Sequence, residues 1–253
     1  MKRFALILEG SRVADDSPID GCKRDAGAME SWLTSPAGGA WEKEEVEVVH
    51  NPWQFEIDSG KAKLDAADFA IVTFSGHGHL EQTKDGLDQR LVIGSGNGPK
   101  DISLSSLYPN APKSIVMIDA CRKIEPAPVI KMARAFTFNE RIEMEMDRNA
   151  YRAAYEKAIQ NANDGRFLLM ACSVNEFAGE DNLNGGLFTH TLLEVARNWC
   201  LTQSGAGICT IGQAFDAAEP VVTQAAKQRG RIQRPKAYRF PDRILRFPFA
   251  VKV

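Results

Sequence analysis

A histidine and a cysteine each follow a short apolar run, and their residue types suit nucleophilic catalysis. His77 ends the stretch "IVTFSGH", and Cys121 ends the stretch "SIVMIDAC". A thiolate attacks carbonyl carbon well, and an imidazole can take up the thiol proton and later deliver it to a leaving amine. The two residues therefore predict a Cys/His catalytic pair, provided that the fold brings the ends of the two runs together.

Other catalytic arrangements fit the same region less well. A G-x-S-x-G elbow is absent because Thr73 occupies the first glycine position, so Ser75 is a poor candidate nucleophile. His190 and Glu194 are one helical turn apart, but "FTHTLLEVA" is typical of an amphipathic helix and offers no third metal ligand nearby. The sequence therefore predicts no metal site there.

Apolar runs of strand length alternate with helical patterns along the chain. The predicted strands are Arg3–Leu8, Glu45–His50, Ala70–Ser75, Ser114–Asp119 and Phe167–Ala171. The predicted helices are Cys22–Leu33, about Phe188–Trp199 and Ile211–Lys227. Continuous apolar strands separated by helices indicate an α/β fold with a parallel sheet covered on both faces. "DGLDQRLVIGSGNGPKDISL" predicts a hairpin followed by a turn, and "RILRFPFAVKV" predicts an edge element that contains Pro248.

The predicted sheet explains how distant residues could form one site. Ligands of open parallel sheets bind at the carboxyl ends of the strands. His77 follows the third predicted strand and Cys121 the fourth. Both side chains are therefore expected to project from neighbouring strand ends into one crevice.

Composition limits the classes of protein to consider. The 253 residues are 44% hydrophobic and 25% charged, which fits one large globular domain. A net charge of −2 gives no reason to expect nucleic acid or an anionic membrane as partner. No membrane span or secretory signal is recognised, so we expect a cytoplasmic protein. Five cysteines without a C-x-x-C pair are expected to be free thiols: Cys22, Cys121, Cys172, Cys200 and Cys209.

The motifs around the histidine and cysteine resemble those of caspase-like cysteine peptidases. "FSGHG" followed by "IDAC" carries the resemblance, and within that group it is closest to metacaspases and their bacterial relatives. "ALILEGS", "IDGCKRDAGAMESWL" and "FLLMACSVNEFAGEDNLNGGLFTHTLL" extend it over nearly the whole chain. After the cysteine the chain has "CRKI", closer to the C-R of animal caspases than to the usual C-H-S-G of metacaspases. The resemblance implies one caspase-like domain over residues 1–253, with an open, mostly parallel sheet of about six strands and helices on both faces.

The resemblance also implies roles for individual residues. Cys121 would be the nucleophile, His77 its proton partner, and the N–H groups of Gly78 and Cys121 the oxyanion hole. His79 has no assigned role and is expected to be an exposed turn residue. The positions that match the metacaspase pocket for a basic side chain are Cys22, Asp25, Ser75 and Asp119.

A pocket with two carboxylates implies a substrate with a positive charge. Asp25 and Asp119 could hold a guanidinium by charge-assisted hydrogen bonds, so we expect cleavage of proteins or peptides after Arg, less well after Lys. Considered separately, Asp25 could be a helix cap and Asp119 a turn former. No cofactor is expected. Calcium stays an open question, because Asp85 and Asp88 lie in an acidic loop but are too few for a complete site.

A charged helical insertion is predicted at about 123–164, directly after the cysteine, and a solvated helix is its simplest interpretation. In the resembling family this region often carries a processing site, so we expect self-cleavage between Lys123 and Arg148. A regulatory protein partner is left open. Three alternatives to the peptidase also stay open: a non-proteolytic caspase-like scaffold, a different cysteine amidase or acyltransferase, and a pure binding module.

Overall fold

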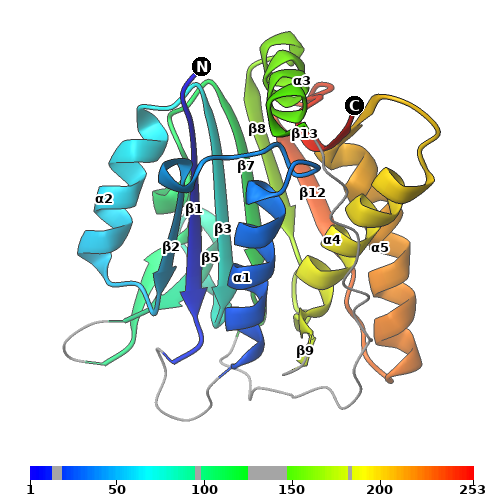
Figure 1. Cartoon of the computed structure of the whole chain (residues 1–253). Coiled ribbons are helices and arrows are strands. Elements are labelled where there is room, and N and C mark those ends of the chain that lie inside the picture. The colour runs from blue at the N-terminus through cyan, green and yellow to red at the C-terminus, as the bar shows by residue number, and fades with distance from the viewer. Residues whose placement is uncertain (13–18, 95–97, 125–146, 182–183) are drawn as a thin grey trace.

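A six-stranded sheet forms the centre of the molecule (Figure 1). The computed structural model describes residues 1–12, 19–94, 98–124, 147–181 and 184–253. The strand order is β12-β8-β7-β3-β1-β2, with β12 antiparallel to β8 and the other pairs parallel. The six strands are β1 (Arg3–Gly10), β2 (Val46–His50), β3 (Phe69–Gly76), β7 (Lys113–Asp119), β8 (Gly165–Met170) and β12 (Lys236–Phe240). The predicted open, mostly parallel sheet is thus confirmed.

The central strands are apolar throughout because both faces of the sheet are covered. Every residue of β1 and β3 is buried. Alternate residues point to opposite faces, so Ala5 and Ile7 pack into one core and Leu6 and Leu8 into the other. The continuous apolar runs in the sequence reflect this two-sided burial.

Helices cover both faces, as predicted. The first core contains side chains from α1 (Gly21–Thr34), α3 (Arg148–Asn161), α4 (Leu187–Thr202) and α5 (Ile211–Gln228). The second core contains side chains from α2 (Gln54–Asp65) and the 3-10 helix η2 (Leu104–Leu107). A further 3-10 turn, η1 (Lys43–Glu45), precedes β2.

Three small sheets complete the described fold. The predicted hairpin is present as β5 (Gly86–Ile93) and β6 (Lys100–Ser103), and the unpredicted strand β4 (Gly78–Thr83) pairs with β5 to complete an antiparallel sheet. The other two are the pair β9 (Glu180–Asp181) with β10 (Gly185–Gly186), and the pair β11 (Gly207–Thr210) with β13 (Pro248–Lys252). Because β4 begins directly after His77, the three-stranded sheet is attached to the carboxyl edge of the central sheet.

Helix α2 and strand β12 are among the elements that were not predicted, and the terminal segment was only partly placed. Helix α2 buries only Ile57, Gly60 and Leu64, so its apolar periodicity is weak. Strand β12 alternates between exposed and half-buried residues and contains no apolar run, because it lies at the edge of the sheet. The terminal segment does form a strand, β13, but it pairs with β11 and not with the central sheet.

The predicted insertion at 123–164 contains α3, and its residues 125–146 lie outside the described part of the chain. Among the described helices, none has the length and apolar character required to cross a bilayer.

Candidate active site

The register of the central sheet places His77 and Cys121 at the same level. β3 and β7 are parallel neighbours, and their last paired residues are Ser75 and Asp119. His77 and Cys121 each follow two residues later, on strands that lie about 4.8 Å apart. The structure thus brings the two predicted catalytic residues to adjacent strand ends on the carboxyl edge of the sheet.

The three-stranded sheet holds the backbone on both sides of this pair. The carbonyl of His77 accepts a hydrogen bond from the Val92 N–H at 3.0 Å. The Leu80 N–H donates to the carbonyl of Lys123 at 2.6 Å, which joins β4 to the chain just after the cysteine. These hydrogen bonds fix the loops of His77 and Cys121, and both residues are half-buried.

The Cys121 thiol lies in a mixed electrostatic environment. Burial raises its pKa, a backbone hydrogen bond with Ala178 lowers it, the charge of Asp119 raises it and that of Lys123 lowers it, with a net rise. The Sγ lies 3.9 Å from the Ala178 oxygen. The resting group is therefore the thiol, and its proton has to leave when the sulfur attacks.

Gly78 packs closely against the cysteine loop. A Cβ added at this position would lie 2.9 Å from the Ala120 Cβ and 2.9 Å from the Arg90 carbonyl oxygen. A larger residue would push the β4 backbone away from the loop that carries Cys121. Glycine at position 78 therefore permits the close backbone approach that an oxyanion hole formed by these two residues would need.

The structure also brings together the residues of the predicted basic pocket. Ser75 Oγ donates to Asp25 Oδ2 at 2.5 Å. Asp119, the last residue of β7, accepts hydrogen bonds at Oδ2 from Thr189 Oγ1 at 2.8 Å and from the Thr189 N–H at 3.1 Å. Cys22 is buried in the same region, and burial together with the charge of Asp25 raises its pKa. The interpretation of Asp25 as a helix cap is wrong, because it lies inside α1, whose N-cap is Asp20.

The two carboxyl groups of this pocket are unfavourably placed for two negative charges. Their residues are 4% and 7% exposed. Burial raises the pKa of Asp25, and the charge of Asp119 raises it further. Burial raises the pKa of Asp119 to about 6, although hydrogen bonds from Thr189 oppose this. A cation placed between the two carboxylates would relieve both the burial cost and their repulsion.

Three residues of this pocket were not predicted individually: Glu180, Gly186 and Thr189. The Gly186 N–H donates to Asp25 Oδ1 at 2.8 Å, and a Cβ added to Gly186 would overlap Asp119 Oδ2 and lie 3.0 Å from Asp25 Oδ2. One glycine thus lies against both carboxylates. Glu180 is buried and accepts from the Gly21 N–H at 3.1 Å. Their segment was recognised only as part of the family resemblance, and the doubled glycine before a helix was the available signal.

His79 is not an exposed turn residue, contrary to expectation. It lies in β4 opposite Arg90, it is partly buried, and its Nε2 lies 3.4 Å from Asp101 Oδ2. The strand that follows His77 directly leaves no room for a longer turn.

In the acidic loop considered for calcium, the Asp88 carboxylate interacts with other side chains. Asp88 accepts from Ser103 Oγ at 2.9 Å and lies 3.2 Å from Arg90 Nη1. Within the described ranges, no group of three or more His, Cys, Asp or Glu residues is arranged to hold a metal ion.

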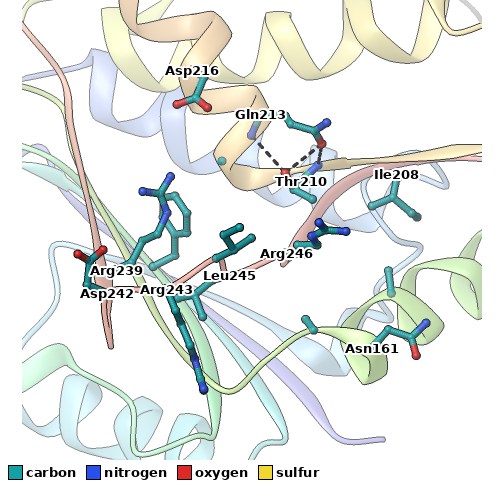
Figure 2. A pocket seen from close by; sticks show the side chains of 15 residues that line it. Asn161, Ile208, Thr210, Gln213, Asp216, Arg239, Asp242, Arg243, Leu245 and Arg246 are labelled. Atoms are coloured by element: carbon teal, nitrogen blue, oxygen red, sulfur yellow. Dashed lines mark hydrogen bonds between the residues drawn. The ribbon is translucent and has the colours of Figure 1, made fainter.

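A cavity of about 900 Å³ lies elsewhere, between the start of α5, β12 and the segment before β13 (Figure 2). Its lining includes Phe167 and Arg239, and β12 reaches the start of β8 where Phe240 pairs with Arg166. This cavity is therefore at the amino ends of the parallel strands. It contains none of the residues of the candidate active site.

The described fold, an open and mostly parallel six-stranded sheet with helices on both faces, matches the caspase-like α/β fold. The family model of the caspase domain, Peptidase C14, matches residues 2–243, and the chain belongs to this family.

Solved structures give the same fold. Caspase-1 from Spodoptera frugiperda aligns with a TM-score of 0.56 at 14% identity, covering 94% of this chain and 87% of that one. Protein GSU0716 from Geobacter sulfurreducens aligns with a TM-score of 0.56 at 17% identity, covering 94% and 93%. No curated protein matches the chain by sequence.

Proposed function

We propose that this protein is a cysteine endopeptidase that cuts protein or peptide chains after basic residues, Arg in preference to Lys. The observation that carries the proposal is the pair of buried carboxyl groups, Asp25 and Asp119, at the sheet edge that also bears His77 and Cys121. Membership of the caspase domain family supports the cysteine peptidase chemistry. The acidic pocket supports the choice of substrate.

The reaction follows from the residues at the strand ends. Cys121 Sγ attacks the scissile carbonyl carbon, a C–S bond forms, the carbonyl π electrons move to oxygen, and the thiol proton passes to His77. The intermediate collapses, the C–N bond breaks, and the amine leaves with the proton from His77. Water then adds to the acyl thioester and gives a proton to His77, which returns it to the departing Cys121 sulfur as the acid is released.

The oxyanion of each tetrahedral intermediate would accept hydrogen bonds from the N–H groups of Gly78 and Cys121. Backbone donors fixed by the neighbouring strands need no rearrangement as the charge develops. Asp25 and Asp119 would hold the basic side chain of the residue before the scissile bond. A guanidinium can engage both carboxylates with its planar fork, whereas an ammonium is a point charge, so Arg is favoured over Lys. An acidic side chain would leave three like charges together.

One assay with matched peptides tests this proposal. The peptides differ only in the final residue before the fluorogenic group, which is Arg, Lys or Asp. The Arg peptide should be cut fastest, the Lys peptide more slowly and the Asp peptide not at all. Cys121→Ala and His77→Ala should each abolish turnover, because they act as a unit. Cys200→Ala, at a half-buried cysteine of α4, serves as the control and should keep the wild-type turnover.

The pocket is tested separately. Asp25→Ala and Asp119→Ala should each cost about 2 to 5 kcal/mol of kcat/KM for the Arg peptide, the range for breaking a desolvated charge pair. Asp20→Ala, at the start of the same helix as Asp25, is the control. A preferred Asp peptide would contradict the pocket assignment. A wild-type protein inactive on every peptide would favour the scaffold, and hydrolysis of small amides alone would favour an amidase.

Self-processing between Lys123 and Arg148 is part of the proposal. Arg148 is a poor site, because it begins α3 and its guanidinium donates to the carbonyls of Thr34 and Trp41 at 2.5 and 2.6 Å. The better candidates are Lys131, Arg134 and Arg141, which lie outside the described residues. Intact-mass measurement after long incubation should show two fragments for the wild type and one uncut species for Cys121→Ala. A single species in both would contradict processing.

A further inference from the structure

A buried glutamine beneath the nucleophile loop has every polar atom of its amide in use. Gln89, on β5, is 5% exposed. Its Nε2 donates to the Cys121 carbonyl at 3.1 Å and to the Arg90 carbonyl at 3.1 Å. Its Oε1 accepts from Arg122 Nε at 3.1 Å. Because the Arg122 side chain can only donate, the amide oxygen must face it, and the amide nitrogen must then face the two carbonyls.

The hydrogen bond to the Cys121 carbonyl fixes one peptide plane next to the nucleophile. The same plane is held at its other end, where the Arg122 N–H donates to the Glu176 carbonyl at 3.0 Å. The plane before Cys121 is held as well, because the Ala120 carbonyl accepts from Cys172 Sγ at 3.5 Å. With the planes on both sides fixed, the direction of the Cys121 N–H is fixed too. Of these three hydrogen bonds, the one from Gln89 is made by a residue of β5.

The same amide lies against the second proposed oxyanion donor. A Cβ built on Gly78 would lie 3.0 Å from Gln89 Nε2. Gly78 is also paired with Leu91, two residues after Gln89 on β5. A single side chain therefore hydrogen-bonds the backbone of Cys121 and lies beside Gly78, the two residues whose N–H groups would donate to the oxyanion.

We propose that Gln89 is a positioning residue that sets the relative placement of the Gly78 and Cys121 N–H groups, and so forms the oxyanion hole without touching the substrate. This inference rests on the proposed cysteine chemistry but not on the preference for Arg. Its physical basis is preorganisation: donors that are held before charge develops stabilise the transition state more than donors that must first rearrange.

Two substitutions separate the contacts of Gln89. Gln89→Glu keeps an acceptor for Arg122 but has no donor for the Cys121 carbonyl. Gln89→Leu removes both contacts at similar volume. For the Arg peptide, both variants should lose roughly 100-fold in kcat, the usual effect of a lost oxyanion donor, with little change in KM. The matched control is Gln82 on neighbouring β4, which is exposed and, among the described residues, donates to the Thr83 carbonyl alone, so Gln82→Leu should match the wild type.

Chemical labelling of Cys121 tests the inference even if peptides are not cut. Acylation by p-nitrophenyl acetate passes through an oxyanion, whereas alkylation by iodoacetamide does not. Mass mapping of Cys121 should therefore show acylation slowed at least about 10-fold in Gln89→Leu, with alkylation nearly unchanged. Equal loss of both reactions would mean a disturbed thiol or fold, and unchanged acylation would mean no role in the oxyanion hole; either result overturns the proposal. If acylation falls as expected while the wild type does not cut the Arg peptide, the substrate assignment fails and the role of Gln89 stands.

Discussion

The coupled carboxyl groups of Asp25 and Asp119 should set the acid limb of the pH profile. Burial raises the pKa of Asp119 to about 6 and that of Asp25 well above its usual value, and only the carboxylate forms can pair with a guanidinium. We expect kcat/KM for an Arg peptide to rise as pH increases through about 6, because this ratio reports groups of the free enzyme. Thr189→Val removes a hydrogen bond that favours the Asp119 carboxylate and should move the inflection to higher pH. Thr191→Val, at another buried threonine of α4, should leave it in place. An inflection that does not respond to Thr189→Val would assign the limb to another group.

The Asp119 carboxylate should couple substrate charge to the reactivity of the thiol. The negative charge of Asp119 contributes to the raised pKa of Cys121, after burial as the main cause. A small guanidinium ion in the pocket neutralises that charge, so it should lower the pKa and speed alkylation of Cys121 by iodoacetamide at pH 7. Peptide mapping measures the rate at Cys121 alone. Asp119→Asn should alkylate faster without guanidinium and gain nothing from adding it. Slower alkylation of the wild type with guanidinium would mean that the ion blocks the thiol.

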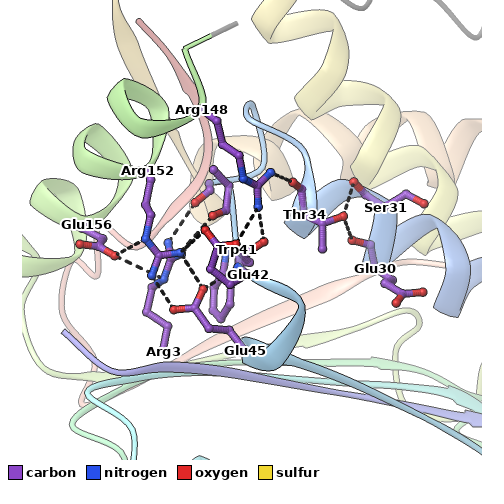
Figure 3. A network of polar contacts seen from close by, with 12 residues as sticks. Arg3, Glu30, Ser31, Thr34, Trp41, Glu42, Glu45, Arg148, Arg152 and Glu156 are labelled. Carbon is purple, nitrogen blue, oxygen red and sulfur yellow. Dashed lines mark hydrogen bonds and ion pairs between the residues drawn. The ribbon is translucent and has the colours of Figure 1, made fainter.

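At the scale of elements, a network of arginine and glutamate side chains attaches α3 to the rest of the domain (Figure 3). Helix α3 is the first described element after the candidate cleavage region. Arg152 makes two hydrogen bonds to Glu45, at 2.8 and 2.7 Å, and its Nε lies 3.1 Å from Glu156 Oε1. Arg3, from β1, donates to the same Glu45 carboxylate at 2.9 Å. One carboxylate therefore ties α3 to the first strand of the sheet.

Removal of Arg152 should weaken the fold in a pH-dependent way. Burial alone would raise the pKa of Glu45, but hydrogen bonds from Arg152 and Arg3 lower it from 4.5 to about 2. A lowered carboxyl pKa stabilises the fold above pH 4.5, and this stabilisation is lost as pH falls towards 2. Arg152→Ala should thus reduce the free energy of unfolding at pH 7 by about 1 to 3 kcal/mol, with a smaller difference near pH 3. Urea unfolding measures both values. Lys61→Ala, which breaks an i,i+4 pair within α2, should cost under about 0.5 kcal/mol. A constant difference at both pH values would contradict the role of Glu45.

At the scale of the whole molecule, the sequence predicted the strands whose apolar composition follows from burial on both faces of the sheet. The runs that became β1, β3 and β7 are apolar because helices or small sheets cover both faces, and strand ends in a parallel sheet share one edge, so His77 and Cys121 could be placed. Contacts between distant segments could not be read in the same way. Gln89 and Thr189 have ordinary polar side chains in amphipathic elements. Only the packing of β5 against the loop of Cys121, and of α4 against Asp119 at the end of β7, gives them a role.

The last prediction concerns whether the two fragments of the domain stay associated after the chain is cut. A break within residues 125–146 separates β1, β3 and β7 from β8 and β12, yet β7 and β8 are hydrogen-bonded neighbours and α3 is tied to Glu45. A specific protease site placed in this range in the Cys121→Ala protein should therefore give, after cutting, two fragments that co-elute at the native volume and separate in urea. Unfolding then becomes dissociation, so the Tm of the cut protein should rise with protein concentration, while that of the uncut protein stays constant. Separate elution at micromolar concentration would show that the peptide bond itself holds the two halves together.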